Sequence, residues 1–237
     1  MKNTYHKGIL LAFIASVASA GFMIPWKLAA FEGSAEDMVF ILCVGAALVS
    51  TATLIGQGGF PAAFSRPSRL EFCLSILFAL FTILGNQASA RAIHYLAPAV
   101  VTSIMRLEVV FITLLAWYFL TERVNFAFWV GLGFVAIGFY TMQPSFEWQG
   151  DWWQGAFFGA AAALIFAIMA VVTRAYIHAI NPSRVNGLRL WLAVILWFPI
   201  QQKLPAFDQW TGNFVWLVLC AAILGPGLGL LAIKQNL

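Results

Sequence analysis

Long apolar stretches follow one another along almost the whole chain, and they restrict the fold more than any other feature. Each has about 17–24 residues, the length that an α-helix needs to cross a hydrocarbon core of about 30 Å. Strands of a membrane barrel would be about ten residues long and would alternate in polarity, a pattern that the sequence lacks. The approximate spans are residues 8–29, 38–56, 70–92, 97–120, 126–142, 153–176, 184–200 and 213–233. We therefore expect an all-α polytopic membrane protein with about eight transmembrane helices.

Composition supports this fold class and excludes several functions. Charged residues are 9% of the chain and hydrophobic residues 62%, whereas a soluble domain has roughly 25% charged residues. The net charge of +4 does not indicate nucleic-acid binding, because the basic residues stand singly between apolar segments. The three cysteines and three histidines lack the spacing of a metal site or of a catalytic centre. We expect no metal, no cofactor, no nucleic-acid partner and no enzymatic activity.

The distribution of Lys and Arg predicts the orientation in the membrane. With a cytoplasmic N-terminus, the inner positions hold Lys2, Lys7, Arg66, Arg69, Arg123, Arg174, Arg184 and Lys234. The outer positions hold only Lys27, Arg91 and Lys203. Basic residues resist translocation, so we expect the N-terminus in the cytoplasm. The first twenty residues imitate a signal peptide, but the apolar stretch continues to Ala30, which favours a retained first helix.

Two patterns recur along the chain and indicate an internal repeat. Small residues stand at every fourth position of the first and sixth spans. They are Gly8, Ala12, Ser16 and Ala20, and then Gly155, Gly159, Ala163 and Ala167. The third and eighth spans share Ile-Leu-Gly followed by Ala-Ile, at residues 83–85 and 92–93 and at residues 223–225 and 232–233. Small residues alone also fit close helix packing, but both patterns in the same order favour a repeat.

If the sixth helix repeats the first, each repeat contains five helices, and this odd number inverts the second copy in the membrane. Inverted repeats are an architecture of secondary transporters. We expect the first repeat at residues 1–143 and the second at residues 150–237. The second would then lack its fourth and fifth helices, about 50 residues, so we expect the chain to be truncated.

Residues 85–142 resemble EamA-type transporters of the drug/metabolite transporter superfamily. The run Ala88–Ala99 resembles the end of the third and the start of the fourth helix in that family. Residues 106–111, Arg-Leu-Glu-Val-Val-Phe, are similar to its LEPVF-type segment, with Val109 at the usual proline. Residues 120–124 are similar to its LGER element, with Thr121 at the glycine. The resemblance implies ten helices in two inverted halves, cytoplasmic termini, and transport of small metabolites, amino acids or drugs across the inner membrane.

Arg106 and Glu108 are the first candidates for substrate binding or coupling. They lie near the middle of the fourth span, where a charge costs at least a few kcal/mol unless it faces the protein interior or a water-filled cavity. Two residues apart on a helix, they point about 200° from each other. We expect one to face a cavity and the other to pair with a neighbouring helix. The alternative is an ion pair that only locks helices together.

Two segments are expected to interrupt helices at membrane depth. Gly225, Pro226 and Gly227 interrupt the eighth span, and Gly85, Asn86 and Gln87 place two amides at the corresponding place in the third. Matching interruptions in both halves indicate a transporter's binding site, because freed backbone groups need a cavity or a ligand. The alternative is a kink filled by neighbouring side chains.

Three further candidates lie at the ends of the first and sixth spans. Lys27 and Arg174 correspond to each other at the spacing of the repeat and end on opposite faces. They either contact anionic groups or snorkel to the lipid headgroups. Trp26, beside Lys27, is a candidate to stack on a substrate.

These features together predict a secondary transporter that works by alternating access, with a small-molecule substrate and the lipid bilayer as partners. A homo-oligomer is compatible with the pattern. Glu108 would be the proton-sensitive carboxylate if transport is proton-coupled. Two alternatives stay open: a non-transporting remnant or subunit that needs a partner, and, with less support, a membrane-embedded lipid-modifying enzyme.

Overall fold

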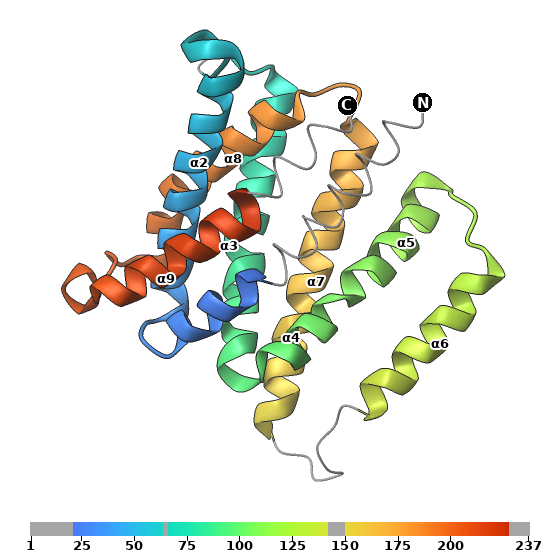
Figure 1. The fold of residues 1–237 in the computed structure, drawn as a ribbon. Coiled ribbons are helices and arrows are strands. Elements are labelled where there is room, and N and C mark those ends of the chain that lie inside the picture. The colour runs from blue at the N-terminus through green and yellow to red at the C-terminus, as the bar shows by residue number, and fades with distance from the viewer. Residues whose placement is uncertain (1–20, 64–65, 142–149, 228–237) are drawn as a thin grey trace, which may run out of the picture. The chain divides into compact units, whose positions relative to one another are not determined.

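The computed structural model describes residues 21–63, 66–141 and 150–227 (Figure 1). All regular structure in these ranges is helical. The elements are α2 (Ala35–Ala63), α3 (Arg69–Tyr95), α4 (Pro98–Met105), α5 (Leu107–Leu120), α6 (Phe126–Thr141), α7 (Gly150–Tyr176), α8 (Pro182–Gln201), the short 3₁₀ helix η1 (Phe207–Gln209), α9 (Gly212–Ala222) and the π turn η2 (Ile223–Gly227). Residues 21–30 are helical as well. The predicted all-α fold is confirmed.

Four segments in the described ranges are long and apolar enough to cross a membrane. They are Ala35–Gly56, Arg69–Tyr95, Pro98–Leu120 and Gly150–Tyr176. Phe126–Thr141 and Gly212–Gly225 are apolar but shorter. The chain is thus a multi-pass membrane protein. Most of the predicted first span, up to residue 20, lies outside the described residues.

The chain divides into two compact units. The first, unit 1, comprises Met1–Ile83 and Ile180–Leu237, and the second, unit 2, comprises Leu84–Ala179. Each unit combines segments of both predicted repeats, and α3 contributes to both units. The repeat boundaries at residues 1–143 and 150–237 therefore stay a prediction.

In unit 1, α2 packs against α8 and α9 through glycines. A Cβ at Gly187 of α8 would lie 3.0 Å from Leu54 of α2, and one at Gly45 of α2 would lie 3.0 Å from the Cβ of Ala222 in α9. The missing side chain of glycine lets these helices approach closely, as is common at helix interfaces in lipid.

In unit 2, α7 packs against α4 and α5. The small residues predicted to repeat in α7 form its packing face: Gly155, Gly159, Ala163 and Ala167 are all buried. A Cβ at Gly159 would lie 2.9 Å from the Cγ2 of Ile104 in α4. The stripe therefore serves close helix packing.

Candidate functional site

The residues predicted to form the site are divided between the two units. Trp26, Lys27, Pro226 and Gly227 belong to unit 1. Asn86, Gln87, Arg106, Glu108 and Arg174 belong to unit 2. Each group is described within its own unit.

The structure brings Trp26 close to the predicted interruption of the eighth span. The Trp26 ring stacks on Phe22, with centroids 5.3 Å apart, and a Cβ at Gly225 would lie 2.9 Å from the Phe22 ring. The regular α-helix α9 ends at Ala222, and Gly225, Pro226 and Gly227 lie in the π turn η2. The rest of the predicted eighth span lies outside the described residues, so the interruption stays a prediction. The π turn forms because proline has no backbone N–H to donate and cannot continue a regular helix.

Trp26 also carries a buried hydrogen-bond donor, its indole N–H. Its side chain is fully buried, and its Nε1–H has no partner among the described residues. A buried donor of this kind costs about 1–3 kcal/mol unless another molecule accepts from it. A solute or a water with an acceptor oxygen would remove that cost.

The expected interruption of the third span is wrong. Helix α3 runs without a break from Arg69 to Tyr95, through Gly85, Asn86 and Gln87. Gly85 serves packing instead, since a Cβ there would lie 2.9 Å from the ring of Phe166 in α7. A single glycine keeps its backbone N–H, so it weakens a helix without ending it.

Gln87 nevertheless resembles Trp26 in its hydrogen bonding. Its side chain is buried, and its Nε2 has no partner in the described part of the chain. Asn86 beside it is half-buried. Gln87 is therefore a second buried donor that could bind an acceptor oxygen of a solute.

The predicted fourth span bends at Arg106. The Arg106 N–H donates to the carbonyls of Thr102 at 3.2 Å and Ser103 at 3.1 Å, and the chain continues as α5 from Leu107. The Val109 N–H donates to the Arg106 carbonyl, three residues back, at 3.1 Å. Hydrogen bonds between residues three apart, instead of four, wind the backbone more tightly than a regular α-helix. The bend thus forms although Val109 stands where the resembling family has proline.

Arg106 and Glu108 differ in their surroundings. The Arg106 side chain is exposed on its unit and Glu108 is half-buried. Neither takes part in a salt bridge within the described residues. The alternative of an ion pair that locks helices together therefore has no support from the described residues.

Lys27 and Arg174 both have partners within their own units. The Nζ of Lys27 lies 4.8 Å from the centroid of the Phe31 ring, a cation–π distance. The Nη2 of Arg174 lies 2.8 Å from the Oε1 of Glu122. Glu122 belongs to the LGER-like element, so this ion pair joins the end of α7 to the residues that follow α5.

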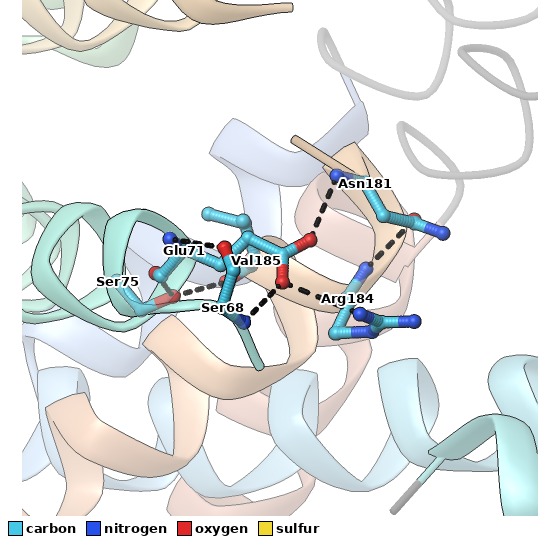
Figure 2. A network of polar contacts seen from close by, with 6 residues as sticks. All are labelled: Ser68, Glu71, Ser75, Asn181, Arg184 and Val185. Atoms are coloured by element: carbon cyan, nitrogen blue, oxygen red, sulfur yellow. Dashed lines mark hydrogen bonds and ion pairs between the residues drawn. The ribbon is translucent and has the colours of Figure 1, made fainter. Parts of the chain in front are cut away.

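Sequence reasoning did not identify a network around Glu71 (Figure 2). The Glu71 carboxylate, 4% exposed, accepts from the N–H of Ser68 at 2.8 Å and from the N–H of Asn181 at 3.0 Å. The Nη1 of Arg184 lies 3.3 Å from the same carboxylate. A signal was present: residues 68–71 read Ser-Arg-Leu-Glu, a capping box at a helix start. The box is formed, because the Glu71 N–H also donates to the Ser68 hydroxyl oxygen at 3.2 Å.

Chemically, these groups can hold polar solutes or ions and can join helices. Among the described residues, no group of three or more His, Cys, Asp or Glu side chains is placed to hold a metal. The polar groups at hand are indole, amide, carboxylate and guanidinium groups, all of which act through hydrogen bonds and charge.

Comparisons with known proteins agree with this architecture. The model of the EamA-like transporter family matches residues 6–142. Ten chains of solved structures match as well. One of them is described only as the crystal structure of a protein and has a TM-score of 0.67 at 16% sequence identity. The match covers 98% of this chain and 79% of the chain in that structure. At this identity the likeness shows the fold alone. None of the curated proteins matches the chain.

Proposed function

Because the chain belongs to the EamA-like transporter family, we propose that it is a secondary transporter that moves a small metabolite, amino acid or drug by alternating access. We place it in a bacterial-type inner membrane with the N-terminus in the cytoplasm, as the distribution of Lys and Arg favours. The family is one of transporters, which leaves the lipid-modifying enzyme without support.

The observation that carries the proposal is that each unit holds a buried donor without an acceptor among the described residues, Trp26 Nε1 in unit 1 and Gln87 Nε2 in unit 2. A protein interior seldom leaves such groups unpaired. A transporter needs donors of this kind, because its substrate must find inside the protein the hydrogen bonds that it gives up in water. A carboxylate or carbonyl oxygen of a solute would fit either donor.

The inverted repeat is supported by the helix starts in unit 1. The hydroxyl oxygen of Ser34 accepts from the Asp37 N–H at the start of α2, at 3.1 Å. The side-chain oxygen of Asn181 accepts from the Arg184 N–H at the start of α8, at 3.2 Å. Ser34 and Asn181 are separated in sequence by the same distance as Gly8 and Gly155. The capping positions thus follow the spacing of the repeat.

The test is solute flux in vesicles that contain the full chain, with a panel of labelled amino acids, monocarboxylates and organic cations. Trp26→Phe removes the indole N–H and keeps an aromatic ring, and Gln87→Met removes the amide at similar volume. We expect each to weaken transport of a carboxylate-bearing solute about tenfold, the effect of ~1.4 kcal/mol. Trp216→Phe, on an exposed side chain of α9, is the matched control.

Two results would contradict the proposal. Folded protein that moves no member of the panel would favour the non-transporting remnant, especially if flux appeared only with a second membrane protein present. Flux that is equal in wild type, Trp26→Phe and Gln87→Met would separate transport from the two buried donors.

A further inference from the structure

We propose that two polar networks at opposite ends of unit 1 act as the closing contacts of the transport cycle, and that one opens while the other stays closed. The first, the Glu71 network, joins the starts of α3 and α8. The second, the Glu32 network, joins the residues before α2 to the start of α9. This inference rests on the proposed transport function.

The Glu71 network surrounds a buried carboxylate with donors that are themselves exposed or half-buried (Figure 2). Two of the three donors to the Glu71 carboxylate, the Asn181 N–H and Arg184 Nη1, come from the start of α8, and the third is the Ser68 N–H before α3. The Ser75 hydroxyl, 2.7 Å from the Glu71 carbonyl oxygen, lies 3.4 Å from the carbonyl oxygen of Val185. One carboxylate thus holds two helix starts together.

In the Glu32 network, too, one carboxylate accepts hydrogen bonds from groups at a helix start, but this carboxylate is exposed. The Glu32 carboxylate accepts from the Thr211 hydroxyl at 2.8 Å and from the side-chain amide of Asn213. Thr211 also caps α9, because its Oγ1 accepts from the Phe214 N–H at 3.0 Å. Nearby, Asp37 accepts from the Ala206 N–H at 3.4 Å. A carboxylate again joins segments far apart in sequence at a helix start.

The two networks lie at opposite ends of the antiparallel pair α2 and α8. Near the end of α8, Trp197 Nε1 donates to the carbonyl of Glu36 at the start of α2, at 3.1 Å. Near the start of α8, the side-chain amide of Asn186 lies 3.5 Å from the hydroxyl of Ser50, farther along α2. The Glu32 network therefore accompanies the start of α2, and the Glu71 network accompanies the start of α8.

The helices of unit 1 also approach closely at glycines. Gly45 of α2 packs on Ala222 and Leu219 of α9, and a Cβ at Gly187, beside Asn186, would lie 3.0 Å from Leu54 and 3.4 Å from the Ser50 hydroxyl oxygen. Farther along the α2–α8 pair, the Trp191 Nε1–H donates to the Thr51 hydroxyl oxygen at 2.9 Å. Apolar contacts of small residues can persist while helices tilt, whereas a hydrogen bond at a helix end is made or lost over about an ångström. The hydrogen bonds at the helix starts are thus suited to open and close while the glycine contacts between the helices persist.

Burial makes the two networks unequal. The difference lies in the carboxylates: Glu71 is 4% exposed, whereas Glu32 is exposed, and both carboxylates have exposed partners. Hydrogen bonds to a charged group are stronger when they are shielded from water. We therefore expect the Glu71 network to hold more firmly, and the resting protein to be closed at that end.

Cysteine accessibility in the full membrane-embedded chain tests the inference. Cys43, Cys73 and Cys220 are first replaced by alanine, and single cysteines are placed at the buried positions Ser75, beside the Glu71 network, and Ala35, at the start of α2. N-ethylmaleimide labelling is then followed over time. Glu71→Gln should speed labelling at position 75 about tenfold, equal to ~1.4 kcal/mol, and slow labelling at position 35. Glu32→Gln should do the reverse.

The opposite changes at the two ends distinguish a transport switch from local loosening. Asp208→Asn, on an exposed carboxylate of η1, is the control and should change neither rate. Arg184→Gln is a second variant and should change both labelling rates in the same directions as Glu71→Gln. If Glu71→Gln does not fold, Arg184→Gln replaces it in the test. Faster labelling at position 75 with an unchanged rate at position 35 would overturn the inference. Labelling needs no solute, so it is independent of the flux measurement. Opposite changes of the two labelling rates in a protein without solute flux would contradict only the proposed function. Solute flux in a protein whose two labelling rates do not change in opposite directions would contradict only this inference.

Discussion

The Val109 N–H donates to the carbonyl of Arg106, three residues back, rather than to the residue four positions earlier as in a regular α-helix. The bend at Arg106 is therefore a property of the backbone and does not depend on a proline. The segment that this region resembles usually has proline here, and in this chain the bend forms with Val109 in its place.

Val109→Pro should for this reason be tolerated. Proline inside a helix usually costs about 3 kcal/mol, because it removes a hydrogen bond and clashes with the preceding turn. At Val109 only the bond to Arg106 is lost, and we expect a cost of about 1 kcal/mol. Ile112→Pro, one turn farther along α5, should cost about 3 kcal/mol or more. The free energy of unfolding of both variants is measured in detergent by titration with SDS. Equal losses of this free energy would show that position 109 tolerates proline no better than position 112.

Thr121 closes α5 in the left-handed region, with φ of 55°. A β-branched residue is strained there, whereas the glycine usual in the family is not. Thr121→Gly should raise the free energy of unfolding by about 1 kcal/mol. Thr113→Gly, inside α5, should lower it, since glycine is a poor helix former. A loss of stability in Thr121→Gly would mean that the Thr121 hydroxyl, 2.7 Å from the Leu120 carbonyl, outweighs the strain.

The sequence predicted features whose cause is local and missed those whose cause lies far along the chain. Apolar length predicted the helices, and the missing N–H of Pro226 accounts for the change from α-helix to the π turn η2 after Ala222. The break expected at Gly85 does not form, because the glycine fits Phe166 of another helix. Glu71 showed a local capping signal, but its partner Asn181 is 110 residues away, and no sequence pattern links the two.

Gly159, on the packing face of α7, and Gly131, in α6, provide a matched pair of glycine substitutions. A Cβ at Gly159 would lie 2.9 Å from the buried side chain of Ile104, whereas nothing lies within 4 Å of a Cβ at Gly131 in α6. Gly159→Ala should lower the free energy of unfolding by about 1–3 kcal/mol, the usual cost of overpacking. Gly131→Ala should raise it by up to about 1 kcal/mol through helix propensity. Thermal unfolding in detergent compares them, and a neutral Gly159→Ala would mean that α4 and α7 can separate freely.

Glu108 is the carboxylate to test for proton coupling, since it is half-buried within α5 and takes part in no salt bridge among the described residues. Glu108→Gln keeps the shape of the side chain and removes its ability to bind and release a proton. If Glu108 carries the proton, the variant should lose accumulation driven by a pH gradient and keep solute exchange without a gradient. Glu122→Gln, at the exposed ion pair with Arg174, should keep both activities. Accumulation that follows the pH gradient as well in Glu108→Gln as in wild type would assign the coupling to another group. Loss of exchange together with accumulation would instead place Glu108 in solute binding.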